Sequence, residues 1–427
     1  MTLSAGPSGG SSHVDVAALI ASVESRHARE AVLGTAVRTP TLECPALAQG
    51  PGTSAALKAE CLQGTGSFKL RGALSKIAAL GAHPEGRRQA ESGLVTASAG
   101  NHARAVAQAA GLRGVSCEVF MPVDVPVSKL AAVQALGARV HLAGASVEDA
   151  LELAAARALE LGAAFVHPFD DLDVIAGQGT LALELLEDVP DLARVVVPVG
   201  GGGLASGVGI ALRKAGAGVR LVGVQADACA PYAHVLREGA EPARTSAATI
   251  ADGIAIKRPG ALTLPLLGEL LDELVTVSEE QIADAMVFLA EHAKLIAEGA
   301  GAVAVAAIRS GLLPPMPGTT VAIVSGGNVD SGLLAGLLLR HETEEGRRVR
   351  VFTRVADRPG GLAELLTLIA RVRANLVTVE HVREAVPLHV RETGVELTLQ
   401  TRGREHTDEL LAALVAAGYE VSTEREV

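Results

Sequence analysis

The segment around Lys69 has the residue types expected of a reactive amine. Lys69 follows Gly66 and Ser67, which favour a turn, and it precedes an apolar run that predicts a helix. A helix N-terminus and partial burial both disfavour a charged ammonium group. Such an amine deprotonates easily and could form a Schiff base with an aldehyde cofactor. The alternative is an exposed lysine at an ordinary helix start.

A second segment, residues 98–102, follows a short predicted strand over 93–96 and opens a helix. Its small residues would let the backbone approach a ligand, and N–H groups at a helix start favour a carboxylate or phosphate. The Asn101 amide could also donate a hydrogen bond to a phenolic oxygen. The alternative is a plain strand-to-helix turn in which Asn101 is the N-cap and His102 is structural.

Four consecutive glycines, 200–203, lie between a predicted strand and a predicted helix. Ordering four glycines costs much backbone entropy, so we expect their N–H groups to bind an anion. Gly200, Gly202 and Ala205 formally match the dinucleotide fingerprint G-x-G-x-x-A, which keeps a nicotinamide cofactor open as an alternative. A dinucleotide site needs an acidic residue for the ribose at the end of the next strand. Here that strand ends at Gln225, and Asp227 lies two residues on.

The fourth segment is Ser-Gly-Gly-Asn at residues 325–328, after a predicted strand over 319–324. A serine hydroxyl at the carboxyl end of a strand, here that of Ser325, can face a bound ring. The alternative is a Ser-Gly turn without a ligand.

These segments are embedded in repeated helix–strand units. Predicted helices end near Gly111, Gly137 and Gly162, and each is followed by a β-rich run. The third helix is the clearest, because Ser146 and Asp149 form a capping-box pattern ahead of an apolar stripe. The strands are expected over 115–121, 138–142 and 163–166.

The same alternation resumes with continuous apolar strands over 194–199 and 220–224 and a helix between them. Continuous apolar strands that alternate with helices indicate a parallel sheet covered on both faces. Ligands bind such sheets at the carboxyl ends of the strands. We therefore predict an α/β fold that gathers the four segments at one edge.

The character of the chain changes at the charged residues 341–347, which we interpret as a linker. The following order, βαββαβ, predicts a separate ferredoxin-like domain over 348–427. Its elements are expected at 349–355, 362–373, 376–383, 395–400, 407–417 and 420–422.

Composition excludes several classes of protein. The net charge is −11, aromatic residues make up 2% of the chain, and tryptophan is absent, so a nucleic-acid partner is not expected. Residues 1–14 predict a mobile tail rather than a signal peptide, and we find no apolar run of membrane-spanning length. Scattered single cysteines fit a reducing, cytoplasmic compartment. They are Cys44, Cys61, Cys117 and Cys229.

Taken together, the motifs S-F-K-L-R-G-A, S-A-G-N-H-A, P-V-G-G-G-G-L and S-G-G-N resemble the threonine dehydratase (threonine ammonia-lyase) family of fold type II pyridoxal-phosphate enzymes, related to the tryptophan synthase β chain. The resemblance covers about residues 15–340 and implies two parallel-sheet subdomains, the smaller near 62–168. The C-terminal plait resembles an ACT domain, a small amino-acid-sensing module.

The resemblance implies roles for individual residues. Lys69 would bind the pyridoxal 5′-phosphate aldehyde and remove the substrate Cα proton, with Phe68 beside the ring. Asn101 would bind the ring hydroxyl, and Ser325 would meet the pyridine nitrogen. The phosphate would rest on Gly200, Gly201, Gly202, Gly203 and Leu204. Backbone donors to the substrate carboxylate would come from Ser98, Ala99 and Gly100.

The implied reaction is elimination of L-threonine to 2-oxobutanoate and ammonia. A neutral Ser325 opposite the pyridine nitrogen would favour elimination over long-lived carbanion chemistry. In racemase-like relatives an acidic residue helps bind a divalent cation where this chain has Gln225, so we predict no metal site.

The ACT resemblance implies a homodimer or homotetramer and an amino-acid effector, a branched-chain one if the enzyme serves isoleucine biosynthesis. The effector residues would be Asp357, Gly360, Gly361 and Asn375.

Three alternatives stay open at this point. A serine dehydratase or serine racemase shares the same four motifs. A nicotinamide-dependent dehydrogenase would use the glycine run for a dinucleotide. A catalytically inactive amino-acid sensor is the third, although all four segments that could carry the chemistry are present.

Overall fold

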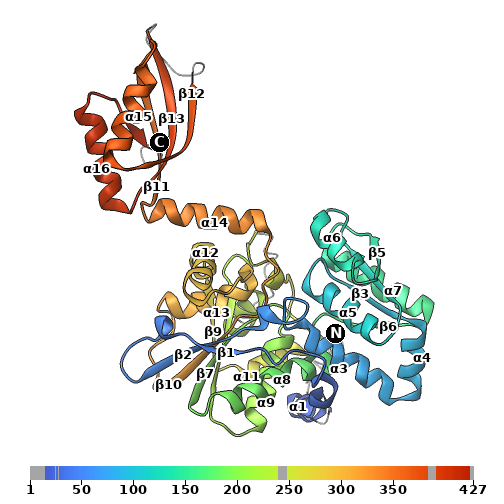
Figure 1. The fold of residues 1–427 in the computed structure, drawn as a ribbon. Helices are drawn as coiled ribbons and strands as arrows, with labels where there is room; N and C mark the ends of the chain where they lie inside the picture. The colour runs from blue at the N-terminus through green and yellow to red at the C-terminus, as the bar shows by residue number, and fades with distance from the viewer. Residues whose placement is uncertain (1–14, 25, 27, 239–247, 383–390, 424–427) are drawn as a thin grey trace, which may run out of the picture. The chain divides into compact units, whose positions relative to one another are not determined.

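The computed structural model describes residues 15–24, 26, 28–238, 248–382 and 391–423 (Figure 1). Its contacts divide the chain into two compact units, Met1–Val329 and Asp330–Val427. The divide falls before position 340, the boundary expected from the sequence. The tail predicted for 1–14 lies outside the described residues.

The N-terminal unit contains a six-stranded sheet in the order β1-β2-β10-β7-β8-β9. Every pairing is parallel except that of β1 with β2. The central strands are wholly buried along most of their length, as continuous apolar runs predict. The bounds are β1 Thr41–Glu43, β2 Thr53–Lys58, β7 Leu192–Pro198, β8 Arg220–Ala226, β9 Glu273–Val277 and β10 Gly318–Ile323.

Helices cover both faces of this large sheet (Figure 1). On one face, α8 and α9 share an apolar core with β7, β8 and β10. The opposite face is covered by α13, whose small residues are buried almost throughout. The helices around this sheet are α1 Val16–Glu24, α2 Ala28–Val32, α8 Leu172–Asp188, α9 Gly203–Lys214, α10 Pro231–Glu238, α11 Thr263–Leu270, α12 Glu279–Phe288 and α13 Gly299–Arg309.

A second, four-stranded parallel sheet has the order β5-β4-β3-β6. One of its faces packs against α3 and α5, and the other against α7. The two parallel sheets agree with the predicted fold class. The bounds are α3 Lys69–Ala82, α4 Pro84–Ser92, β3 Leu94–Ala97, α5 Asn101–Leu112, β4 Cys117–Met121, α6 Val127–Gln134, β5 Arg139–Leu142, α7 Val147–Leu161 and β6 Ala164–Phe165.

The local signals in this region are confirmed with small shifts of boundary. The capping box of Ser146 and Asp149 opens α7, and Gly162 closes it in the left-handed conformation. Gly137 lies in the turn after α6, with a φ of 84°. Gly111, expected to end a helix, lies inside the last turn of α5. Among the described residues, no helix is both long and apolar enough to cross a bilayer.

The C-terminal unit is a βαββαβ plait with antiparallel strand order β12-β13-β11-β14. Its core lies between the sheet and helices α15 and α16. The predicted order of elements is therefore correct. The bounds are α14 Ser331–Glu344, β11 Arg348–Ala356, α15 Gly361–Val372, β12 Asn375–Val382, β13 Glu392–Gln400, α16 Arg404–Ala416 and β14 Ser422–Thr423.

The predicted linker over 341–347 is partly wrong, because residues 341–344 form the last turn of α14. Charged residues are common in solvent-exposed linkers, but at helical spacing they can also form ion pairs that stabilise a helix. Here Arg340 and Glu344 form an ion pair of 2.7 Å at i,i+4 spacing.

Candidate active site

Three of the predicted segments follow strands at the carboxyl ends of the two parallel sheets. β3 leads into residues 98–100, β7 leads into the glycine run, and β10 leads into Ser325. The backbone of the lysine segment joins the last of these, because Ser67 pairs with Gly326 and the N–H of Phe68 donates to the Ser325 carbonyl at 3.1 Å. Segments far apart in the sequence thus meet, as the fold class predicts.

Lys69 is the first residue of α3, and its amine is not exposed at an ordinary helix start. The side chain is half-buried, and Nζ donates to the Pro168 carbonyl at 2.8 Å. Burial lowers the pKa of Lys69 to about 8, and the charge of Glu298 acts in the opposite direction. The amine also lies 5.2 Å from the centre of the Phe68 ring. Near neutral pH, a lysine in this setting has a larger neutral, nucleophilic fraction than an exposed lysine.

Phe169, the residue after Pro168, packs against the glycine run. The ring of Phe169 packs so closely on Gly201 that a Cβ there would lie 2.1 Å from it. Gly202 has a φ of 86°, which other residues rarely adopt, and Gly200 lies against Ile254. Glycines are therefore required in this turn by close packing and backbone conformation together.

The start of α9, which follows the glycine turn, has backbone N–H groups without a side-chain cap. No side chain caps this helix, and its first turn carries no acidic residue. The turn itself is braced from outside, because the Tyr232 hydroxyl donates to the Gly201 carbonyl at 2.8 Å. Two serine hydroxyls, Ser206 Oγ in α9 and Ser67 Oγ in the lysine segment, are buried without a hydrogen-bond partner. Uncapped N–H groups with a helix dipole behind them suit a phosphate.

Both polar groups of the Gln225 side chain form hydrogen bonds with the backbone around the large sheet. Its Nε2 donates to the Val199 carbonyl at 3.1 Å, and its Oε1 accepts from the Ala233 N–H at 3.0 Å. The residue is fully buried and carries no charge. It therefore cannot supply the carboxylate that a dinucleotide site uses for its ribose, which argues against the nicotinamide alternative.

Asn101 is not the N-cap of its helix, which corrects that alternative. The N-cap is Gly100, and Asn101 is the first helical residue, with its side chain directed to other segments. Its Nδ2 donates to Glu298 Oε1 at 2.6 Å, and its Oδ1 accepts from Asn328 Nδ2 at 2.7 Å. His102 is buried and bonded through Nε2 to Val166, as expected of a structural residue.

Two of the three backbone N–H groups of residues 98–100 already donate hydrogen bonds within the protein. The N–H of Ser98 donates to Phe120 at 3.1 Å, and that of Gly100 donates to the Ser98 hydroxyl at 3.1 Å. A substrate carboxylate would have to displace the second of these bonds. Ala99 lies between them, and the role of this turn in binding substrate stays a prediction.

Ser325 lies two residues after the end of the buried strand β10, at the carboxyl edge of the sheet. Its side chain is 3% exposed, and Oγ donates to the Ala300 carbonyl at 3.3 Å. A hydroxyl can donate or accept, so it can meet a ring nitrogen without carrying charge. Its role toward a ring stays a prediction.

Sequence reasoning missed the residues that hold Asn101. Glu298 stands in a run of small apolar residues, and Asn328 was noted only as the end of the Ser-Gly-Gly-Asn motif. Burial, and after it the charge of Asp252, raises the pKa of Glu298 to about 7. A single carboxylate in an apolar, glycine-rich segment is the signal that could have identified Glu298.

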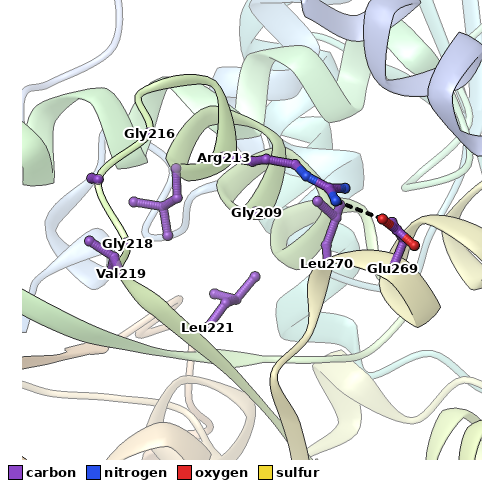
Figure 2. A pocket seen from close by; sticks show the side chains of 10 residues that line it. Gly209, Arg213, Gly216, Gly218, Val219, Leu221, Glu269 and Leu270 are labelled. Atoms are coloured by element: carbon purple, nitrogen blue, oxygen red, sulfur yellow. Dashed lines mark hydrogen bonds and ion pairs between the residues drawn. The ribbon is translucent and has the colours of Figure 1, made fainter.

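A surface pocket lies at the opposite end of α9 from the glycine turn (Figure 2). Its rim carries the ion pair of Arg213 and Glu269, with nitrogen and oxygen 2.6 Å apart. Leu221, near the start of β8, also lines it. No predicted site residue lines this pocket, so it does not belong to the candidate active site.

The two parallel sheets, a half-buried lysine at a helix start and a glycine turn at the start of an uncapped helix are the features of fold type II pyridoxal-phosphate enzymes. The chain belongs to this class, because residues 32–326 match the model of the pyridoxal-phosphate dependent enzyme family.

Comparison with individual relatives shows which members of the family the chain is similar to. The chain is 44% identical over 385 residues to an L-threonine ammonia-lyase of Thermotoga maritima, covering 90% of this chain and 94% of the relative. An L-threonine ammonia-lyase of Geobacter sulfurreducens is 43% identical over 85% of this chain and 89% of its own length.

Among solved structures, a threonine deaminase of tomato, Solanum lycopersicum, matches with a TM-score of 0.67 and 30% identity, covering 78% of this chain and 90% of the other. A maize serine racemase matches with a TM-score of 0.68 and 33% identity, covering 77% and 98%.

Proposed function

We propose that this chain catalyses the pyridoxal-phosphate-dependent α,β-elimination of L-threonine to 2-oxobutanoate and ammonia. Two relatives named for this activity match most of the chain. The observation that carries the proposal is the half-buried Lys69 amine with its lowered pKa, held at Pro168 next to the glycine turn.

The chain supplies a base and the cofactor supplies an electron sink. When bound, pyridoxal phosphate delocalises the negative charge left at the substrate Cα. Lys69 Nζ would hold the cofactor through its aldehyde before turnover. Once the substrate amine has taken its place on the aldehyde, the freed Lys69 amine would take the Cα proton. Its position in a low-dielectric site supports both tasks, because a neutral amine is needed for each.

The remaining residues bind and orient. The N–H groups of residues 200–204 would hold the phosphate at the start of α9, where no side chain forms a capping hydrogen bond. Asn101 would donate to the ring hydroxyl, and Ser325 would meet the pyridine nitrogen. Phe68 would lie beside the ring, and residues 98–100 would take the substrate carboxylate.

L-Serine is the second candidate substrate, because a maize serine racemase shares the fold. The two substrates differ by one methyl group, which a hydrophobic contact can discriminate by only about 10–200-fold. The test is to measure kcat/KM for both amino acids and identify the products. Formation of 2-oxobutanoate with the higher kcat/KM supports the proposal, whereas pyruvate or D-serine as the preferred product overturns it.

We further propose that the C-terminal plait is an ACT domain that binds an amino-acid effector. Support comes from its strand order and from the relative of Thermotoga maritima, whose match covers more of the chain than the N-terminal unit contains. The turn between β11 and α15 is tight, because Gly360 has a φ of 93° and a Cβ at Gly361 would lie 2.3 Å from the Ala356 carbonyl oxygen. In the same turn, the Asp357 N–H donates to the Arg391 carbonyl.

The structure does not bring the fourth predicted effector residue to this turn. Asn375 opens β12 and bonds Gln400, which pairs with the opposite end of β11. An effector site within one plait would therefore use the β11–α15 turn without Asn375. The test is the threonine saturation curve with isoleucine or valine added. A shifted curve supports control, and an unchanged curve with both amino acids contradicts it.

We also propose that the chain forms a homodimer or homotetramer, since effector control needs two states with different affinity and subunit contacts are a common way to hold them. Light scattering of the purified protein gives the mass. A monomer at assay concentration would contradict this part of the proposal.

A further inference from the structure

A chain of hydrogen bonds fixes the side chain of Asn101 from both sides. On one side, its Nδ2 donates to Glu298 at 2.6 Å. On the other, its Oδ1 accepts from Asn328 at 2.7 Å. Asn328 in turn accepts from Arg104 Nη1 at 2.5 Å. None of these four residues is a neighbour of the next in the sequence.

The orientation of each amide in this chain is determined by groups that can play only one role. Arg104 can only donate, so the Asn328 oxygen must face it. The backbone carbonyl of Thr65 can only accept, and Asn328 Nδ2 donates to it at 2.9 Å, which fixes the same orientation independently. Asn328 therefore offers an N–H toward Asn101.

The orientation of Asn101 follows from this. Its oxygen faces Asn328, so its NH₂ group faces the opposite way, where the Glu298 carboxyl group accepts one of the two N–H bonds. One N–H of Asn101 is left over. In this arrangement Asn101 meets a ligand as a donor, which suits the ring oxygen of pyridoxal phosphate.

We propose that Glu298 and Asn328 are positioning residues that hold the Asn101 amide so that its second N–H donates to the ring oxygen of the cofactor. This inference rests on the proposed function, because it requires that cofactor. Neither residue needs to touch the substrate or the cofactor. They act through Asn101, in the way that outer hydrogen-bond partners orient the ligands of other sites.

Close packing leaves the network no room to rearrange. A Cβ at Gly66 would lie 2.4 Å from Asn328 Oδ1, and a Cβ at Gly326 would lie 2.3 Å from Glu298 Oε1. Glu298 is itself 7% exposed, and its N–H donates to the Gly326 carbonyl at 3.1 Å. The carboxyl group is therefore held against the same backbone that carries Ser325.

The test is a double-mutant cycle that reads cofactor binding rather than turnover alone. Apoprotein variants Asn101→Ala, Glu298→Leu and the double variant are titrated with pyridoxal phosphate, and the visible spectrum of the bound cofactor is recorded. We expect each single variant to weaken binding by about tenfold or more. We expect Glu298→Leu to have no further effect in the Asn101→Ala background.

Two further variants keep the test decisive. Glu298→Gln retains an acceptor oxygen and should recover most of the affinity lost in Glu298→Leu. Asn328→Ala removes the N–H donor that holds the Asn101 oxygen and should weaken binding in the same direction, even if Glu298→Leu fails to fold. Glu118→Gln, which alters a carboxylate bonded to Arg157 and His141 elsewhere, serves as the matched control and should match the parent.

Two outcomes would overturn the inference while leaving the proposed function intact. One is that the losses in Asn101→Ala and Glu298→Leu multiply in the double variant, which means that the residues act independently. The other is that neither Glu298→Leu nor Asn328→Ala changes affinity or spectrum. Failure of the parent to bind pyridoxal phosphate or to convert threonine would instead overturn the proposed function, and the inference with it.

Discussion

The pKa of Lys69, and with it the reactivity of its amine, depends on two opposing effects. Burial lowers the pKa of its amine to about 8, and the Glu298 carboxylate raises it. The amine must be neutral to attack the cofactor aldehyde. The rate at which apoprotein takes up pyridoxal phosphate should therefore rise with pH and level off above about 8.

This prediction is checked by stopped-flow absorbance across the pH range. A cofactor analogue without the aldehyde, which cannot react with the amine, is the control and should not show the same rise. A rate that keeps rising toward the ordinary lysine pKa of 10.5 would show that the amine is not depressed.

Glu298 should make the stability of the apoprotein depend on pH. Its folded pKa of about 7 lies above its ordinary value of 4.5. Between these values the native state holds a proton that the unfolded chain has released, so the free energy of unfolding falls as the pH rises through this window. Asp252 raises this pKa, whereas Lys129, Arg104 and the Asn101 hydrogen bond lower it.

The variant Glu298→Gln has no carboxyl proton to lose and should show a flatter dependence. Urea unfolding of both proteins at several pH values between about 4.5 and 7 measures the difference. If the two curves run parallel, Glu298 does not titrate in this range.

At the residue scale, a functional residue can be predicted from the sequence when the residues next to it in the chain indicate its role. Lys69 and the glycine run belong to this class, because a turn followed by a helix is a local signal. Glu298 and Asn328 do not, because their partner Asn101 lies 197 and 227 positions away. Their roles arise only when β3 and β10 bring their carboxyl ends together.

At the scale of elements, the glycine turn depends on how α9 packs on α8. A Cβ at Gly207 would lie 2.2 Å from the Ile175 carbonyl oxygen and 2.7 Å from the Gly179 nitrogen. Both neighbours are backbone atoms, which cannot move aside without displacing a helix. The variant Gly207→Ala should therefore lower the free energy of unfolding by about 2 kcal/mol or more and weaken cofactor binding.

Gly81→Ala in α3 is the matched control for this prediction. Nothing lies within 4 Å of its Cβ position, so the substitution should be neutral or stabilise the helix by up to about 1 kcal/mol. Thermal unfolding of the apoproteins compares the two. Equal stabilities of Gly207→Ala and Gly81→Ala would mean that α8 and α9 can separate freely.

Element types were predictable, and element ends less so. The capping box of α7 fixes its start by a local hydrogen bond, and the prediction there is confirmed. The end of α14 is different, because residues 341–344 carry charges that fit a linker and a helix equally well. Ion pairing between Arg340 and Glu344 favours the helix, and composition alone does not reveal it.

At the scale of the whole molecule, the two compact units predict a separable regulatory function. A chain that ends at Val329 keeps both parallel sheets and every residue of the proposed catalytic site. It should fold and convert threonine, but its saturation curve should not respond to isoleucine or valine. Kinetics of the shortened and full chains with each amino acid provide the check, and an intact response in the shortened chain would rule out the plait as the effector site.

The architecture of each unit could be predicted from periodicity, because continuous apolar strands and the βαββαβ order are repeated signals. The position of Asn375 could not be predicted in this way, because it depends on the register between strands. Its pairing with Gln400 sets it at the far end of β11 from the turn that holds Asp357.

The central claim is that Lys69 carries the cofactor. Holoenzyme should be reduced with borohydride, which makes the link between an amine and the cofactor aldehyde permanent, and then digested for mass spectrometry. We predict a phosphopyridoxyl group on Lys69 and loss of this label in Lys69→Ala. A label on another lysine, such as the buried Lys58, or no covalent label on an active enzyme, would contradict the account.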